Sequence, residues 1–208
     1  MSEVRVYLGG EGANELGSRC GDAIYQDAGD TSRPGVIETL LCRIQPNGWL
    51  VIGAMKWCHI RKLRSKGPTP NEERNVLGLV VEAKRAKAQV LAFVRDADND
   101  KERPKVIAAA IDKAKLDFPD VDVIGGAAIP VLEGWILAML GESKTETLSK
   151  AAAQTKLVER RILAKDTLAM VRATSDFSIS RLPEDANSLR VWLARARKVL
   201  PLLVGMAT

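Results

Sequence analysis

The sequence alternates short apolar segments with longer segments of helical periodicity, and this alternation limits the folds open to it. The apolar segments are rich in Val, Ile, Leu and aromatic residues and cover residues 4–8, 49–54, 89–94 and 121–124 with 127–129. Apolar side chains at helical spacing predict helices at 36–44, 71–88 and 102–116. Strands that are apolar on both faces and separated by helices are typical of a parallel sheet covered on both sides. The predicted fold class is therefore α/β, with a mostly parallel four-stranded sheet flanked by helices.

From Pro130 onward the sequence predicts helices only, beginning with a short apolar helix at 131–140. We therefore expect two parts: an α/β domain at 1–141, and a C-terminal helical extension at 142–208 that packs on the core.

Two boundaries inside that extension follow from local signals. Ser143 and Glu146 have the spacing of a capping box, which predicts the start of a helix that runs to Arg172. Apolar residues at i, i+3 and i+4 over 189–200 predict a terminal amphipathic helix, and Pro201 is expected to end it.

Composition sets broad limits on the class of protein. With 208 residues, of which 46% are hydrophobic and 27% charged, the chain can form a sizeable core. No apolar run reaches the ~18–20 residues of a membrane span, and residues 1–5 lead directly into a strand, so we expect neither a membrane helix nor a secretory signal. Cys20, Cys42 and Cys58 lack metal-site spacing and are expected to be free thiols of a reducing, cytoplasmic compartment. The net charge of +5 permits nucleic-acid binding without requiring it.

Three aspartates, Asp96, Asp98 and Asp100, follow the apolar segment 89–94. If the strand continued through them, their side chains would leave on one side about 7 Å apart, because side chains in a strand alternate between faces. Like charges so close repel one another unless a cation lies among them, and oxygen-only ligands favour Mg²⁺ or Mn²⁺. The pattern predicts a hydrolytic or phosphoryl-transfer site. The alternative is a polar turn that caps the following helix.

Several better-known motifs are excluded by single positions. An EF-hand loop beginning at the first aspartate would need Gly and Glu where Lys101 and Ile107 stand. Gly12 and Gly17 are not followed by the Lys-Ser/Thr of a phosphate-binding Walker loop, and Glu15 replaces the third glycine of a dinucleotide fingerprint.

Three short motifs in a fixed order carry a resemblance to a known family. They are Glu11-Gly12-x-x-Glu15 after the first strand, Arg95-Asp96-x-Asp98 after a central strand, and Glu133-Gly134-Trp135 on an apolar helix. In these the chain resembles the Toprim (topoisomerase-primase) domain over residues 4–140. It is most similar to small stand-alone Toprim-like proteins of bacterial defence and mobile loci, related to nucleases of the overcoming-lysogenization-defect type. Many Toprim domains have Gly beside the aspartates, where this chain has Asn99 and Lys101.

The resemblance implies roles for individual residues. Glu11 matches the glutamate that acts as metal ligand or general acid/base, and Asp96 and Asp98 match the metal-binding pair; these three are the predicted catalytic residues. Asp100 matches a further acidic residue that assists. The implied cofactor is Mg²⁺ or Mn²⁺.

Glu133 stands in an otherwise apolar run, where a buried, unpaired carboxylate is costly. It either binds a second metal ion or pairs with an arginine such as Arg95. Trp135 beside it is expected to pack in the core.

A basic segment follows the second predicted strand and should emerge at the same edge of the sheet as the carboxylates. Its candidate nucleic-acid contacts are Lys56, His59, Arg61, Lys62, Arg64 and Lys66. Phosphate contact and a solvated charged loop are both open interpretations. We expect His59 to lie at the surface or to contact phosphate rather than to shuttle protons.

These expectations combine into a metal-dependent nuclease that uses metal-activated water. The resemblance further implies an anti-phage defence or mobile-element module with an ABC- or AAA-type ATPase partner. The alternatives are a non-catalytic binding or regulatory subunit and a primase-like nucleotidyl-transfer activity. A phosphatase-like hydrolase is disfavoured, because its aspartate pair would follow the first strand. The sequence leaves open DNA or RNA as substrate, one or two metal ions, and the oligomeric state, a homodimer included.

Overall fold

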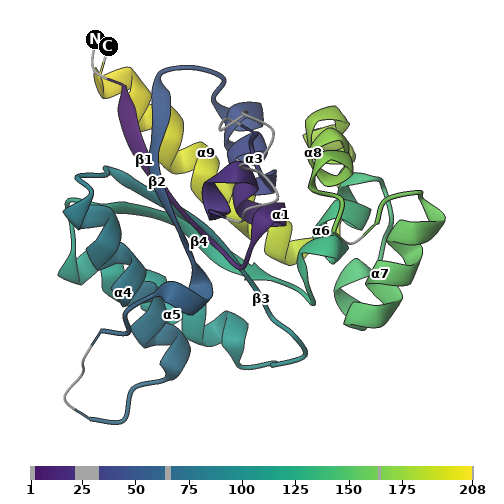
Figure 1. Ribbon diagram of the computed structural model, residues 1–208, viewed down its shortest axis with the longest axis horizontal. Coiled ribbons are helices and arrows are strands. Elements are labelled where there is room, and N and C mark those ends of the chain that lie inside the picture. Colours follow the sequence, from purple (N-terminus) through teal and green to yellow (C-terminus); the bar gives the residue numbers. More distant parts are fainter. Residues whose placement is uncertain (1–2, 22–32, 64–66, 164, 208) are drawn as a thin grey trace.

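The strands form one parallel sheet in the order β2-β1-β3-β4, as the computed structural model shows (Figure 1). The structure describes residues 3–21, 33–63, 67–163 and 165–207. The strands are β1 (Val4–Gly10), β2 (Trp49–Lys56), β3 (Val90–Asp96) and β4 (Asp122–Ala128). The predicted fold class is confirmed, because helices flank this four-stranded parallel sheet.

Helices fill the connections and the C-terminal part of the chain. The α-helices are α1 (Ala13–Leu16), α3 (Val36–Ile44), α4 (Asn71–Arg85), α5 (Arg103–Asp117), α6 (Leu132–Met139), α7 (Lys150–Glu159), α8 (Thr167–Asp176) and α9 (Asn187–Ala207). Short 3₁₀ turns are η1 (Gly17–Cys20), η2 (Trp57–His59), η3 (Thr145–Thr147) and η4 (Ile179–Arg181).

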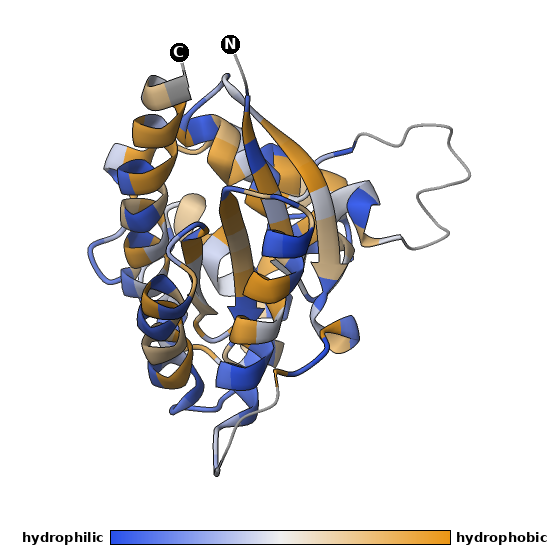
Figure 2. Cartoon of the chain, turned by 90° about the vertical axis from the view of Figure 1, so that its left-hand side faces the viewer, coloured by the Kyte–Doolittle hydropathy of each residue, from blue (hydrophilic) through white to orange (hydrophobic). Residues whose placement is uncertain are grey.

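The sheet lies between two layers of helices (Figure 1). Side chains of β3 alternate between them: Leu91 and Phe93 pack in the cluster with α4 and α5, and Ala92 and Val94 in the cluster with α3, α6 and α9. These four side chains are fully buried. Figure 2 shows the corresponding pattern of apolar strands and mixed helices. A central strand buried on both faces explains why 89–94 reads as a continuous apolar run.

The helix α9 belongs to the layer that covers the sheet on the same face as α3 and α6. The indole Nε1 of Trp192 donates to the carbonyl of Phe93 at 3.0 Å, and Arg195 Nη1 donates to the carbonyl of Gly125 at 2.5 Å. The Trp192 ring also meets that of Trp135 edge-on, with centroids 6.2 Å apart, so Trp135 lies in the core as expected. A single apolar cluster spans both sides of the predicted boundary at residue 141.

The prediction of one helix over 143–172 is wrong. The chain forms η3 and then two helices, with Ser149 Oγ accepting from Ala152 N (3.2 Å) at the start of α7 and Asp166 capping α8. Glu146 makes a different bond from the one predicted, since its carboxylate accepts from the Ser188 amide of α9. A long-range contact therefore replaces the local capping box.

The prediction that Pro201 ends the last helix is also wrong, because α9 continues to Ala207. Pro201 is exposed, so the carbonyl that loses its hydrogen-bond partner faces solvent, where water can bind it. The buried side chains of Leu200 and Val204 on either side keep the helix on the core.

Two smaller findings concern the composition. Cys20, Cys42 and Cys58 are free thiols, as expected. Within the described ranges, no helix combines the length and the apolar character needed to cross a membrane.

Candidate functional site

The carboxyl ends of β1 and β3 enclose the position where ligands bind in open α/β sheets. The connection after β1 leads to β2 on one side, and the connection after β3 leads to β4 on the other. Adjacent strands whose connections diverge leave a crevice between them at the carboxyl edge. Glu11 comes directly after β1, and Asp96 is the last residue of β3. The topology therefore brings these two residues to one crevice.

Glu11 and Asp98 lie beside the side chain of Arg95, and Glu11 also bonds the backbone of Asp96. The Oε1 atom of Glu11 accepts from the Asp96 backbone N–H at 3.0 Å and also from Nη1 of Arg95. Asp98 Oδ2 lies 3.8 Å from the same Nη1. Glu11 and Asp98 thus share a guanidinium as a neighbouring positive charge, and the predicted convergence of all three carboxylates on one ion stays a prediction.

Glu15 joins the site because α1 folds tightly over the end of β1. A Cβ atom on Gly10 would lie 2.5 Å from Cβ of Glu15, so only glycine permits this approach. The Glu15 carboxylate then accepts from the Gly12 amide at 2.9 Å. The spacing of Gly10, Gly12 and Glu15 thereby places a buried carboxylate close to the partly exposed Glu11.

The start of α6 closes the other side of the crevice. Asp96 Oδ1 accepts from the backbone N–H of Leu132 at 2.8 Å. The next residue, Glu133, is buried, and its Oε1 accepts from the Gln154 side chain of α7 at 3.2 Å. The ion pairs of Arg95 go elsewhere, so the expected Arg95–Glu133 pair is not what the structure contains.

The four carboxylates Glu11, Glu15, Asp96 and Glu133 form what we call the acidic cluster. The pKa of Asp96 is raised to about 8, mainly by burial and in smaller part by the charges of the other three members. Burial also raises the pKa of Glu15 to about 7, with the charges of Glu11 and Glu133 acting in the same direction. The cluster is therefore an electrostatically unfavourable group of like charges, of the kind that a bound cation stabilises.

The three aspartates do not alternate along a strand, which corrects the sequence interpretation. β3 ends at Asp96, and Asp98 and Asn99 have positive φ angles of 50° and 68°, so the chain turns sharply. Asp98 points to two basic side chains, with Oδ2 3.1 Å from Arg103 Nη1 and Oδ1 3.1 Å from Lys150 Nζ. Partial burial acts to raise the pKa of Asp98, but Lys150 and the two arginines outweigh it and hold that pKa below its usual range.

Asp100 adopts the capping role that was the alternative to metal binding. Its Oδ1 atom accepts from the backbone N–H groups of Glu102 and Arg103, at 3.0 and 3.1 Å, where α5 begins. This bond pattern accounts for an aspartate at this position without an ion.

Arg103 holds the turn after β3 in place. Its Nη1 atom donates to the carbonyls of Asp96 (2.8 Å) and Ala97 (3.0 Å) as well as to Asp98. Its Nε atom lies 3.1 Å from Oε1 of Glu72, a residue in the first turn of α4.

Sequence reasoning missed the residues that α4, α5 and α7 bring to this edge: Glu72, Arg103, Lys150 and Gln154. Lys150 and Gln154 are four residues apart on one face of α7, but no local signal tells that α7 returns to the carboxyl edge. Glu15 was visible in the Glu-Gly-x-x-Glu motif, and its membership of the site follows only from the fold.

The basic segment begins where β2 ends, at the same edge of the sheet. Trp57 anchors it: the indole is buried, lies 5.5 Å from the Arg95 guanidinium and donates to Glu72 Oε2 at 3.1 Å. His59 and Arg61 are exposed, and the Lys62 ammonium donates to Asn71.

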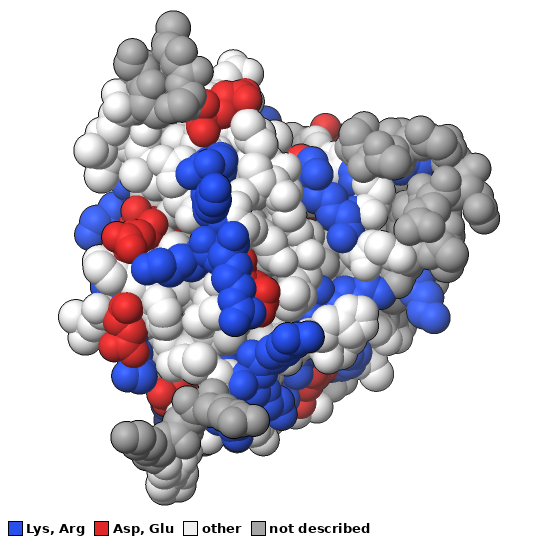
Figure 3. Space-filling model, turned by 60° about the vertical axis from the view of Figure 1, so that its left-hand side comes forward, with Lys and Arg blue, Asp and Glu red and all other residues white. Residues whose placement is uncertain are grey.

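Two of the predicted phosphate contacts, Arg64 and Lys66, lie outside the described residues, and Lys56 is half-buried at the end of β2. Figure 3 shows Lys and Arg side chains in a band down one face of the molecule, with groups of Asp and Glu beside it.

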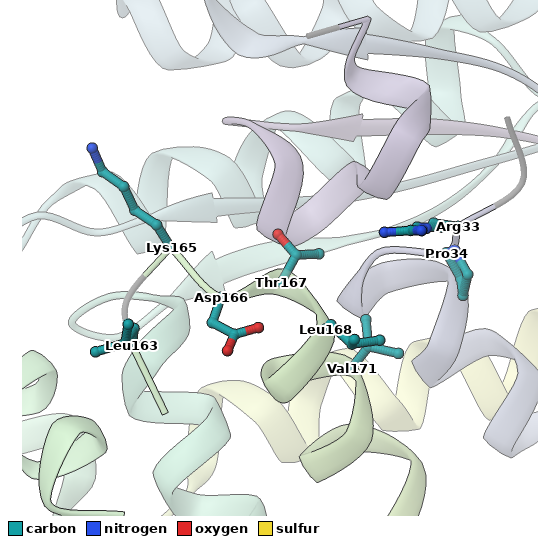
Figure 4. Close-up of a pocket in the computed structure, with 8 residues that line it drawn as sticks. All are labelled: Arg33, Pro34, Leu163, Lys165, Asp166, Thr167, Leu168 and Val171. Carbon is teal, nitrogen blue, oxygen red and sulfur yellow. The ribbon is translucent and has the colours of Figure 1, made fainter. Parts of the chain in front are cut away.

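A cavity of about 660 Å³ lies apart from the acidic cluster. The residues that line it are Arg33, Pro34, Leu163, Lys165, Asp166, Thr167, Leu168 and Val171 (Figure 4). Thr167 on its wall donates to Asn14 Oδ1 at 2.9 Å, which places the cavity behind α1. It contains none of the predicted site residues.

The acidic cluster offers only carboxylate oxygens, the donors that Mg²⁺ and Mn²⁺ prefer. In the part of the chain that the structure describes, no three Asp, Glu, His or Cys side chains are already grouped as ligands of one ion. Glu11 is held by Arg95, and Asp98 is held by Arg103 and Lys150. The donor chemistry thus fits a hard divalent cation, and Glu11 would have to turn away from Arg95 to reach it.

Comparisons with protein-family models, with curated proteins and with solved structures gave no match.

Proposed function

We propose that the protein is a Toprim-like, metal-dependent nuclease whose site is the crevice between the ends of β1 and β3. The observation that carries the proposal is the grouping of Glu11, Glu15, Asp96 and Glu133 at the topological switch point. Asp96 and Glu15 have raised pKa values there, and the charges of Glu11 and Glu133 contribute to both. Strongly perturbed pKa values cluster at functional sites.

Each residue has a role in this proposal. Asp96, Glu11 and Glu133 would hold Mg²⁺ or Mn²⁺, and Glu15 would complete the set of oxygen ligands. The chemistry that such an ion supplies is neutralisation of charge on the phosphate and a lowered pKa of the attacking water. Asp98 serves with Arg103 to fix the turn after β3, in place of its predicted role as catalytic residue and metal ligand.

Lys150 gives the crevice a cationic wall. Its ammonium forms an ion pair with Asp98, and the negative charges of Asp96 and Glu133 also act to raise its pKa. A lysine here attracts a phosphodiester toward the carboxylates. The basic segment from Lys56 to Lys62 emerges at the same edge, where it could hold the strand on either side of the scissile phosphate.

The test is cleavage of plasmid DNA and of single-stranded RNA in the presence of Mn²⁺. Asp96→Asn keeps the size of the side chain and the acceptor for the Leu132 amide, but the amide cannot ionise to bind a metal ion. We expect it to slow cleavage by at least about 100-fold. Asp120→Asn, at an exposed ion pair with Lys84, is the matched control and should cleave like the wild type. Equal cleavage by the Asp96 and Asp120 variants would end the proposal.

A second candidate is a non-catalytic subunit in which the acidic residues are structural. It is favoured by the ion pairs that already neutralise Glu11 and Asp98. This candidate predicts no heat signal when Mn²⁺ is titrated into the protein, and no cleavage by any variant.

The wider context remains an expectation from the resemblance. An anti-phage or mobile-element module with an ABC- or AAA-type ATPase would make cleavage depend on the partner. Cleavage that appears only after an ATPase is added would agree with it.

A further inference from the structure

Arg95 is the centre of a network that connects the acidic cluster to the basic segment. Its guanidinium contacts Glu11, lies 3.6 Å from Glu72 Oε1 and 3.8 Å from Asp98 Oδ2, and lies against the Trp57 ring. One cation thus has three carboxylate neighbours contributed by three different segments of the chain.

The partners of Arg95 differ in how firmly they are held. Glu72 also binds Arg103 at 3.1 Å and Trp57 Nε1 at 3.1 Å, so its carboxylate is fixed from two further sides. Glu11, by contrast, uses its Oε1 atom for Arg95 and for the Asp96 amide, and 30% of its side chain is exposed. Of these two carboxylates, Glu11 is the one that can leave Arg95 without breaking other side-chain bonds of the network.

The position of Glu11 creates a conflict for the proposed site. A divalent ion in the acidic cluster needs the Glu11 carboxylate, and Arg95 competes for it. Without Glu11, the guanidinium keeps Glu72 and Asp98 only at 3.6 and 3.8 Å, so its Nη1 atom loses its short ion pair and, at 15% side-chain exposure, has room in its charge balance for another anion. A phosphodiester is such an anion, since its two free oxygens match the fork of the guanidinium.

We propose that Arg95 exchanges partners: it holds Glu11 in the free protein and binds a substrate phosphate in the complex, which releases Glu11 to the divalent ion. This inference rests on the proposed nuclease function. No covalent bond changes in the exchange; one ion pair is replaced by two, carboxylate with metal and guanidinium with phosphate. Trp57 and Glu72 keep the guanidinium in place throughout.

The exchange makes metal and nucleic acid bind cooperatively. Each ligand removes the competitor of the other, and such coupling is reciprocal. In the wild type, Mn²⁺ should therefore bind about 5- to 150-fold more tightly when an oligonucleotide is present, the usual range of coupling between two sites.

The experiment is a calorimetric titration of Mn²⁺ into the full-length protein, with and without a phosphorothioate oligonucleotide, run separately for DNA and RNA. Oligonucleotide binding alone is measured by fluorescence anisotropy in EDTA. Arg95→Gln should bind Mn²⁺ alone at least as tightly as the wild type, bind the oligonucleotide more weakly, and lose the enhancement. Arg43→Gln is the matched control, because Arg43 also lies over an aromatic ring, that of Phe177, and bonds its carbonyl.

Three outcomes overturn the exchange. If Arg95→Gln binds Mn²⁺ more weakly and keeps the enhancement, Arg95 is only a structural support for Glu11. If the wild type shows no enhancement although both ligands bind, the two sites are independent. If neither Mn²⁺ nor either oligonucleotide binds the wild type, the nuclease proposal fails as well.

Arg95→Lys covers the case in which the glutamine variant does not fold. It keeps a charge that can pair with Glu11, but it lacks the fork that matches a phosphate. We expect Mn²⁺ affinity close to the wild type and a reduced enhancement; an unreduced enhancement again contradicts the exchange.

Discussion

Asp96 and Glu15 show how the position of a carboxylate in the fold sets its pKa. Both belong to motifs that the sequence displays openly, but their pKa values depend on burial by α1 and α6, which the motifs do not encode. Burial and the neighbouring carboxylates raise these pKa values to about 8 and about 7. At neutral pH the folded protein therefore holds protons that the unfolded chain would release.

This uptake of protons predicts how stability depends on pH. The folded pKa values lie above those of an unfolded chain, near 4, so the unfolded state binds fewer protons between about pH 4 and 8. The free energy of unfolding then falls as pH rises through this window. In EDTA, the thermal midpoint should drop from about pH 5 to about pH 9, and Asp96→Asn should flatten the dependence. A variant slope equal to that of the wild type would contradict the assignment.

At the scale of the element, hydrophobic periodicity predicted helices and strands correctly, whereas the capping-box pattern did not. The strands and the helices α3, α4 and α5 could be predicted because their burial pattern repeats along the sequence. The helix over 143–172 could not, since Glu146 bonds Ser188, 42 residues away, and a capping box considers four residues only. The predicted alternation of the aspartates after β3 was wrong for a similar reason: the sequence does not reveal that Asp98 and Asn99 adopt positive φ angles.

Substitutions of Asp100 can distinguish its role at the start of α5 from the predicted role as a metal ligand. Asp100→Ala removes the acceptor for two amides at the start of α5 and should lower the free energy of unfolding by about 0.5–2 kcal/mol. Asp100→Asn keeps an acceptor and should be nearly neutral. Neither change should alter the Mn²⁺ affinity measured by calorimetry. A large loss of affinity in both variants would return Asp100 to the set of metal ligands.

At the scale of the whole molecule, topology decides how much of the site the sequence can reveal. Parallel strands present their carboxyl ends at one edge, so Glu11 and Asp96 could be expected to meet although 85 residues separate them. Lys150 and Gln154 reach the same edge through the packing of α7 against α6, for which the sequence has no short-range signal. Glu11, Asp96 and Glu133 were therefore named from the sequence, whereas the place of Glu15 in the cluster and most of its basic and amide surroundings were not.

The same packing predicts that residues 1–141 do not fold alone. Removing α9 uncovers the sheet face on which Trp192 is fully buried, and truncating one such tryptophan to alanine typically costs about 3–5 kcal/mol. Leu189, Leu193 and Leu200 of α9 are buried as well, so the summed loss should exceed the stability of about 5–15 kcal/mol that a whole domain has. Near-ultraviolet circular dichroism should show no fixed aromatic packing in 1–141, whereas removal of residues 206–208, where Met206 is 76% exposed, should leave the spectrum and the unfolding transition unchanged. A fragment that unfolds in one sharp transition would instead make the helices after residue 141 a separate domain, and the contribution of Lys150 to the site would then depend on how that domain docks.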